Sequence, residues 1–227
     1  MTTFVLVPGA GGQARYWYRL VAELGRRGHV AVAVDLPTDD DSAGLATYAD
    51  TVVAAGNGRG SVVVVAQSMG GLTAPLVCGR LSVELLVLVN AMIPLPGETG
   101  GQWWADTGQQ AARAAHWERE GITGDPGDDV VMFFHDVPAE VVAALLEQPF
   151  AQSGRPFEDP WPLTTWPNVP TRVVVGRDDR CFPADFQRRI AGERLGVAAD
   201  EIPGGHLVAL SRPVELADRL EDYARSI

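Results

Sequence analysis

Short runs of apolar, mainly β-branched residues recur along the chain and alternate with longer segments of helical periodicity. The runs are FVLV at 4–7, VAVAV at 30–34, VVVV at 62–65, LLVLV at 85–89 and RVVVG at 172–176. Strands that are apolar on both faces and separated by helices are typical of a parallel sheet covered on both sides. The pattern therefore predicts an α/β fold, with a mostly parallel central sheet flanked by helices on both faces.

The segments between these runs have the spacing of crossover helices. Apolar positions at helical intervals predict helices over 16–29, 45–56 and 69–81. An amphipathic helix is expected to begin at Pro213, since proline is favoured in a first helical turn, and to continue to the C-terminus. With 227 residues, the chain fits one mid-sized domain with a substantial core.

The alternation breaks between residues 91 and 170. Helical patterns occur at 109–120 and 139–148, and the segment 149–170 is rich in proline and aromatic residues, which predicts an ordered loop. Five of the six tryptophans lie in this part of the chain. We interpret it as a cap or lid insertion over the carboxyl edge of the sheet, where open α/β folds bind ligands.

This interpretation divides the chain into an α/β core, residues 1–90 and 171–227, and a cap, residues 91–170. A plainer alternative is that the aromatic side chains of the insertion only pack it onto the body. The two alternatives are compatible with each other.

Composition excludes several classes of function. All 18 basic residues are arginine, so Schiff-base chemistry, a lysine general base and the lysine of a phosphate-binding P-loop are absent. The formal charge of −11 argues against nucleic acid and anionic membranes as partners. Two cysteines are too few for a disulfide framework or a thiolate zinc site, and we expect no cofactor and no metal.

The N-terminal sequence passes from Met1 directly into an apolar, strand-like run, without a basic region or a cleavage site. No apolar run approaches the roughly 20 residues that a membrane span needs. We therefore expect a cytoplasmic protein, monomeric or homodimeric, whose partner is a small-molecule substrate.

The sequence AQSMGG places a serine where a buried strand meets the next helix. A serine on such a sharp turn is exposed above the sheet and has a strained backbone, which tolerates only small residues two positions away, here Ala66 and Gly70. Ala66 replaces the first glycine of the usual G-x-S-x-G. The helix N-terminus favours negative charge near Ser68. We predict that Ser68 is a nucleophile rather than a helix-capping serine.

A nucleophilic serine needs a base, and the base needs a carboxylate to orient it. His206 follows a short predicted strand and two glycines, which let the loop turn its imidazole toward the sheet edge. Asp179, just past the strand at 172–176, is preferred as the orienting acid over its neighbour Asp178. The chain order Ser68, Asp179, His206 matches the order of one fold. The other histidines are expected in capping or packing roles or facing the substrate: His29, His116 and His135.

The loop VPGAGG at 7–12 follows the first strand and can present a free backbone N–H. We predict an oxyanion hole made by the N–H groups of Ala10 and Met69. A nucleotide site is the weaker alternative, because GAGGQA lacks the G-x-G-x-x-G spacing and the chain has no lysine.

From Phe4 to the C-terminal helix, the order and spacing of these motifs resemble the α/β-hydrolase superfamily. The segment PGAGGQARYWYRL is similar to the HGA…W.W..L region of small bacterial hydrolases related to plant methylesterases and hydroxynitrile lyases. The resemblance implies a sheet of the eight-stranded type with a helical cap, the Ser68–Asp179–His206 triad and the Ala10–Met69 oxyanion hole. Pro8 and Gln67 stand where the family often has histidine, which affects substrate details. The lyases depend on a lysine, which this chain lacks.

The predicted activity is hydrolysis of a carboxylic ester or a related acyl compound, such as a lactone or thioester, through an acyl-enzyme. Two alternatives are carbon–carbon bond hydrolysis or another biosynthetic reaction on a bulky apolar substrate, and a non-catalytic small-molecule receptor. Cys181 is interpreted as a packing residue. Aromatic residues of the insertion, Phe133 among them, are expected to enclose the substrate. The predicted substrate-binding residues are Gly9, Gln67, Trp103, Trp104, Phe134 and Trp161.

Overall fold

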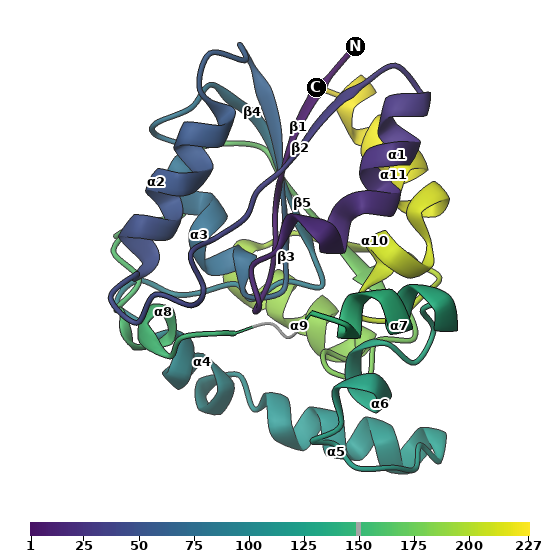
Figure 1. Ribbon diagram of the computed structural model, residues 1–227. Coiled ribbons are helices and arrows are strands. Elements are labelled where there is room, and N and C mark those ends of the chain that lie inside the picture. The colour runs from purple at the N-terminus through teal and green to yellow at the C-terminus, as the bar shows by residue number, and fades with distance from the viewer. Residues whose placement is uncertain (149–150) are drawn as a thin grey trace.

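The strands of the computed structural model, which describes residues 1–148 and 151–227, form one parallel sheet (Figure 1). The strand order is β2-β1-β3-β4-β5-β6. The bounds are β1 Thr3–Val7, β2 Val30–Ala33, β3 Val62–Gln67, β4 Val83–Val89, β5 Thr171–Gly176 and β6 Ala199–Ile202. The five predicted runs are β1 to β5, and the short strand expected before His206 is β6, so the predicted α/β fold is confirmed.

Helices cover both faces of the sheet (Figure 1). The helices on one face are α1 Tyr18–Arg26, α10 Val208–Ser211 and α11 Pro213–Arg225, and those on the other are α2 Leu45–Gly56, α3 Gly70–Val77 and α9 Ala184–Leu195. Successive strand residues alternate between the two apolar layers. Phe4 and Leu6 pack with the first set of helices, whereas Val5 and Val7 pack with the second.

Several helix boundaries in the core differ from the predictions. The segment 16–29 forms a 3₁₀ turn, η1 Ala14–Trp17, followed by α1, which ends at Arg26. The helix predicted over 69–81 is shorter, because the backbone N–H of Cys78 bonds to Pro75 O in a tight three-residue turn that ends α3 at Val77. Helices α2 and α11 begin where they were predicted to begin.

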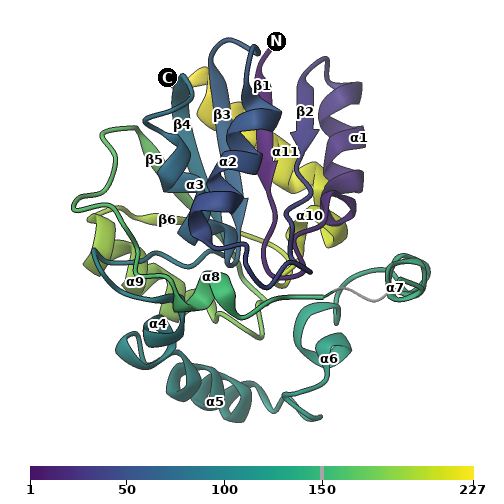
Figure 2. The ribbon, with the colours of Figure 1, turned by 60° about the vertical axis from the view of Figure 1, so that its left-hand side comes forward.

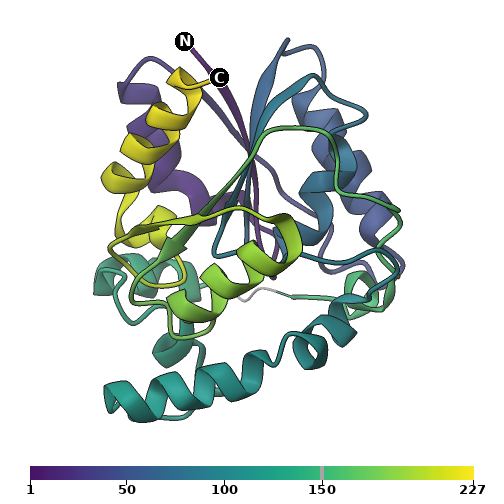
Figure 3. The ribbon, with the colours of Figure 1, turned by 180° about the vertical axis from the view of Figure 1, so that it is seen from behind.

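The segment 91–170 lies beside the carboxyl ends of the strands (Figure 2). Its helices are α4 Gly100–Asp106, α5 Gln109–Glu120, α6 Asp129–Phe133, α7 Ala139–Leu146 and α8 Arg155–Glu158. The prediction of a helix over 109–120 is confirmed, and α7 ends two residues before the predicted 148. The predicted loop contains α8, and its residues 149–150 lie outside the described residues. From behind, α5 runs below the sheet edge (Figure 3). The division into core and cap stays a prediction.

The sheet has six strands among the described residues, not the eight that the resemblance implied. Strand β1 already lies beside β3, with Val7 paired to Ala66. The loop that follows β1 and the turn that follows β3 are therefore neighbours at the carboxyl edge, which brings the two predicted parts of the site together.

Candidate active site

Ser68 lies on the turn between β3 and α3, in a backbone conformation that residues other than glycine rarely adopt. Its φ is 54°, in the left-handed region. Backbone hydrogen bonds hold the turn, among them those from Ser68 N to Asn90 O at 3.1 Å and from Met92 N to Ser68 O at 2.9 Å. A Cβ atom on Gly70 would lie 2.7 Å from Pro8 O, which explains the small residue there.

His206 and Asp179 are paired at the same edge of the sheet. The imidazole Nδ1 lies 2.8 Å from Asp179 Oδ2, and both side chains are almost fully buried. The other carboxylate oxygen of Asp179 accepts the backbone N–H groups of Cys181 and Phe182 at 2.8 and 2.9 Å. A proton on Nδ1, donated to this carboxylate, leaves Nε2 of a neutral imidazole as a hydrogen-bond acceptor.

The alternative acid, Asp178, points away from the imidazole. Its carboxylate bonds to Arg177 and to the backbone N–H of Gly204. Burial alone would raise the pKa of Asp178, but these hydrogen bonds and the charge of Arg177 lower it below its usual value. The structure thus places Asp179, and not Asp178, against His206.

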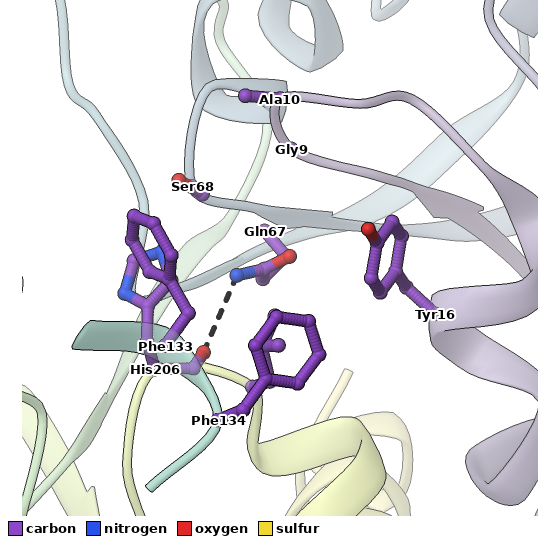
Figure 4. Close-up of a pocket in the computed structure, with 9 residues that line it drawn as sticks. Gly9, Ala10, Tyr16, Gln67, Ser68, Phe133, Phe134 and His206 are labelled. Atoms are coloured by element: carbon purple, nitrogen blue, oxygen red, sulfur yellow. Dashed lines mark hydrogen bonds between the residues drawn. The ribbon is translucent and has the colours of Figure 1, made fainter. Parts of the chain in front are cut away.

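Ser68 and His206 line one cavity, of about 460 Å³ including its open mouth (Figure 4). The other lining residues are Gly9, Ala10, Tyr16, Gln67, Phe133, Phe134 and Leu207. Within the described part of the chain, Ser68 Oγ makes no hydrogen bond with His206. Such bonds commonly tighten only when substrate binds. The ring of Phe133 lies 5.2 Å from the imidazole and covers it.

Two backbone N–H groups beside Ser68 lack an acceptor among the residues that the structure describes: those of Ala10 and Met69. Met69 directly precedes α3, so its N–H is at the positive end of that helix. The loop that carries Ala10 is fixed by Gly12 N bonding to Gly9 O at 3.0 Å and by Gly11 N bonding to Gln152 Oε1 at 2.9 Å.

Trp103, Trp104 and Trp161, which were predicted to surround the substrate, do not line this cavity. Trp103 and Trp161 are 1% and 2% exposed, and their indole N–H groups bond to the carbonyl oxygens of Ile93 and Leu72. Trp104 packs on Phe182 at 5.6 Å between ring centres. Trp103 and Trp161 are therefore core residues, and Trp104 is a partly buried residue packed against the same core.

Of the predicted substrate-binding residues, Gly9, Gln67 and Phe134 do line the cavity. Gln67 forms its rear wall, where its amide nitrogen donates to His206 O at 3.3 Å (Figure 4). Two further lining residues, Tyr16 and Leu207, were not predicted. Tyr16 was predicted only as part of the helix over 16–29, and adjacency to His206 was the one available signal for Leu207.

Residues 4–219 match the model of the alpha/beta hydrolase family. The chain belongs to that family. The prediction of an enzyme of the α/β-hydrolase class is thereby confirmed.

A curated relative and two solved structures agree with this assignment. The chain is 28% identical over 249 residues to the probable esterase PIR7A of Oryza sativa subsp. indica, covering 96% of this chain and 94% of the relative. The structure of polyneuridine aldehyde esterase matches with a TM-score of 0.78 and 20% identity over 99% of both chains. The methylesterase MES16 from Arabidopsis matches with a TM-score of 0.77 and 18% identity over 100% of both chains.

Two features are absent from the described residues. None of their helices is both long and apolar enough to cross a bilayer. Neither do they contain three or more His, Cys, Asp or Glu side chains grouped so as to hold a metal ion. Cys181 is buried, and burial raises the pKa of its thiol, which keeps it protonated.

Proposed function

We propose that the protein hydrolyses a carboxylic ester, or a related acyl compound such as a lactone or thioester, through an acyl-enzyme on Ser68. One observation carries the proposal: a buried carboxylate, Asp179, holds the His206 imidazole at 2.8 Å beside the cavity that also contains the strained Ser68. The esterase names of the curated relatives support the same reaction class.

In the proposed mechanism, His206 Nε2 takes the proton of Ser68 as Oγ attacks the carbonyl carbon. The negative charge that forms on the carbonyl oxygen is stabilised by the N–H groups of Ala10 and Met69. Collapse of this tetrahedral intermediate breaks the bond to the leaving alcohol, which receives the proton from His206. Water then attacks the acyl-enzyme with His206 again as the base, and the acid leaves.

The cavity walls favour a neutral substrate. They are formed largely by Tyr16, Phe133, Phe134 and Leu207, with the neutral amide of Gln67 at the rear. Burial raises the pKa of the Tyr16 phenol, so this side chain is uncharged at neutral pH. A charged acyl group would lose hydration there without gaining a partner of opposite charge from these side chains.

The alternative of a carbon–carbon bond hydrolase on a bulky substrate rested on aromatic residues of the insertion. Three of those, Trp103, Trp104 and Trp161, pack away from the cavity, so this structure gives no observation that favours it. The receptor alternative differs from an enzyme in one measurable way, since a receptor does not need a reactive serine.

The test is turnover of p-nitrophenyl esters by the protein and by single variants. We expect Ser68→Ala and His206→Ala to abolish turnover, and Asp179→Asn to reduce kcat by about 10⁴-fold, since the amide favours the wrong imidazole tautomer. Asp178→Asn is the matched control and should retain most activity. We also expect a fluorophosphonate to label Ser68 in the parent protein but not in the His206→Ala variant. A protein that neither turns over esters nor takes the label, or a Ser68→Ala variant with full turnover, would contradict the proposal.

A further inference from the structure

Asn90 is an uncharged polar residue that follows a run of five apolar strand residues. It directly follows β4, whose last five residues are fully buried, and it is itself 0% exposed. Its φ is 46°, and within the described residues Ser68 and Asn90 are the two non-glycine positions with positive φ. Asparagine tolerates this region better than most residues, but a buried polar side chain here still requires partners.

The side-chain amide of Asn90 joins the two loops that carry His206 and Asp179. Its Nδ2 donates to Gly205 O at 3.0 Å and to His206 O at 2.9 Å. Its Oδ1 accepts the backbone N–H of Gly176 at 2.7 Å, three residues before Asp179. Both protons of the amide nitrogen are used, and each bonds to a backbone carbonyl of the loop 203–206, called the histidine loop below.

The backbone of Asn90 reaches the third member of the predicted triad. Asn90 O accepts Ser68 N at 3.1 Å, so the strained turn of the nucleophile is tied to the same residue. Gln187 on α9 closes the arrangement, since its Nε2 lies 3.2 Å from Asn90 Oδ1 and 3.4 Å from Asp179 Oδ2. Asn90 thus contacts the chain at Ser68, at His206 and three residues before Asp179.

The histidine loop needs such a restraint. It contains Gly204 and Gly205, and Gly204 has a φ of 119° that other residues rarely adopt, so the loop has little conformational preference of its own. The end of β5 approaches it closely, since a Cβ atom on Gly176 would lie 2.5 Å from Gly205 O. The Asn90 amide fixes the spacing between these two backbone segments.

We propose that Asn90 is a positioning residue that sets the place of the His206 imidazole relative to Ser68 and Asp179. Asn90 does not touch the reacting atoms and acts through the two carbonyl groups of the histidine loop. The inference rests on the proposed triad, but one of its measurements does not need a substrate.

Asn90→Gly is the main variant, because glycine keeps the positive φ without strain and removes the whole side chain, the amide together with its Cβ. Asn90→Asp is the second variant: it keeps the size and the Oδ1 acceptor but loses both donors. Val87→Ala, in the same strand, is the control for loss of packing, since Val87 is fully buried and belongs to no part of the site. Thermal unfolding of each variant sets the temperature at which activity is compared.

Two readouts separate positioning from mere stability. The first is ester turnover, where we expect Asn90→Gly and Asn90→Asp to lower kcat by about 10²-fold, the effect of a misplacement near 1 Å, with little change in KM. The second is the downfield proton resonance of the His206 Nδ1–H bond to Asp179, which should shift or broaden in both variants. Val87→Ala should leave kcat and this resonance as in the parent protein, even where its melting temperature falls as far.

Folded Asn90→Gly and Asn90→Asp proteins with the parent kcat and an unchanged resonance would overturn the proposal. So would an equal loss of kcat in Val87→Ala, since the effect would then be general destabilisation. If the parent protein turned over no ester, the proposed function would fail. The resonance would still decide the positioning role, because an unchanged signal in Asn90→Gly would overturn it.

Discussion

Replacing Gly9 by alanine tests how closely the loop after β1 must approach the nucleophile. A Cβ atom on Gly9 would lie 2.7 Å from Ser68 Cβ and 3.3 Å from Ser68 Oγ. Ordinary contacts between carbon atoms lie at about 3.5–4.0 Å. The added methyl group therefore has to push the two backbones apart by about 0.8–1.3 Å.

This displacement falls between two parts of the predicted catalytic machinery, since Gly9 precedes Ala10 and Ser68 precedes Met69. A shift near 1 Å in such a site lowers the rate by about 10²-fold. We therefore expect kcat/KM of Gly9→Ala to fall by about that factor, which corresponds to about 2.7 kcal/mol of transition-state stabilisation. Overpacking by one methyl group costs about 1–3 kcal/mol of folding free energy, or about 2–12 °C in melting temperature.

The assay is p-nitrophenyl ester turnover together with the rate of fluorophosphonate labelling, both measured well below the melting temperature. Gly25→Ala is the matched control, because nothing lies within 4 Å of its added Cβ and Gly25 lies inside α1. That substitution should leave activity unchanged and raise stability by up to about 1 kcal/mol. A Gly9→Ala protein with the parent kcat/KM would refute the reasoning, since the loop would then have no need to touch the serine turn.

Three further changes test the surroundings of the site. Gln152→Ala removes the acceptor of Gly11 N. Loss of an oxyanion donor itself lowers the rate by about 10²–10³-fold, and we expect a smaller fall in kcat/KM here. Unchanged turnover would show that the loop after β1 keeps its place without this hydrogen bond. Glu98→Gln breaks a buried ion pair with Arg194, whose side chains are 5% and 7% exposed, and should cost about 3–5 kcal/mol, checked by urea unfolding; an unshifted midpoint would contradict this. Hydrogen bonds from two arginines lower the pKa of Glu23 from 4.5 to about 2, so the stability that its carboxylate adds is complete above pH 4.5 and disappears as the pH falls toward 2. The difference in melting temperature between the parent protein and Glu23→Gln should shrink over that window; a constant difference would exclude the charge as its cause.

Much of the sheet could be predicted because its strands are local patterns. The four valines at 62–65 place apolar side chains on both faces of the sheet, as a strand covered on both sides requires, and residues 85–89 do the same. Helix ends were less predictable, since α3 stops at Val77 through a turn that depends on the carbonyl of Pro75. The role of the tryptophans could not be predicted, because an indole uses the same apolar surface to enclose a ligand or to pack in a core. Only tertiary partners, such as Ile93 O for Trp103, distinguish the two roles.

The order of residues in the sequence was enough to select the candidate catalytic residues of this protein. Ser68, Asp179 and His206 each follow a strand, and the carboxyl ends of parallel strands meet at one edge. Tertiary structure alone decided which carboxylate faces the imidazole, because Asp178 and Asp179 are neighbours in the chain but point to Gly204 and His206 respectively. It also revealed Asn90, whose side-chain partners lie 86 to 116 residues away in the chain and can be recognised only after the strands are side by side.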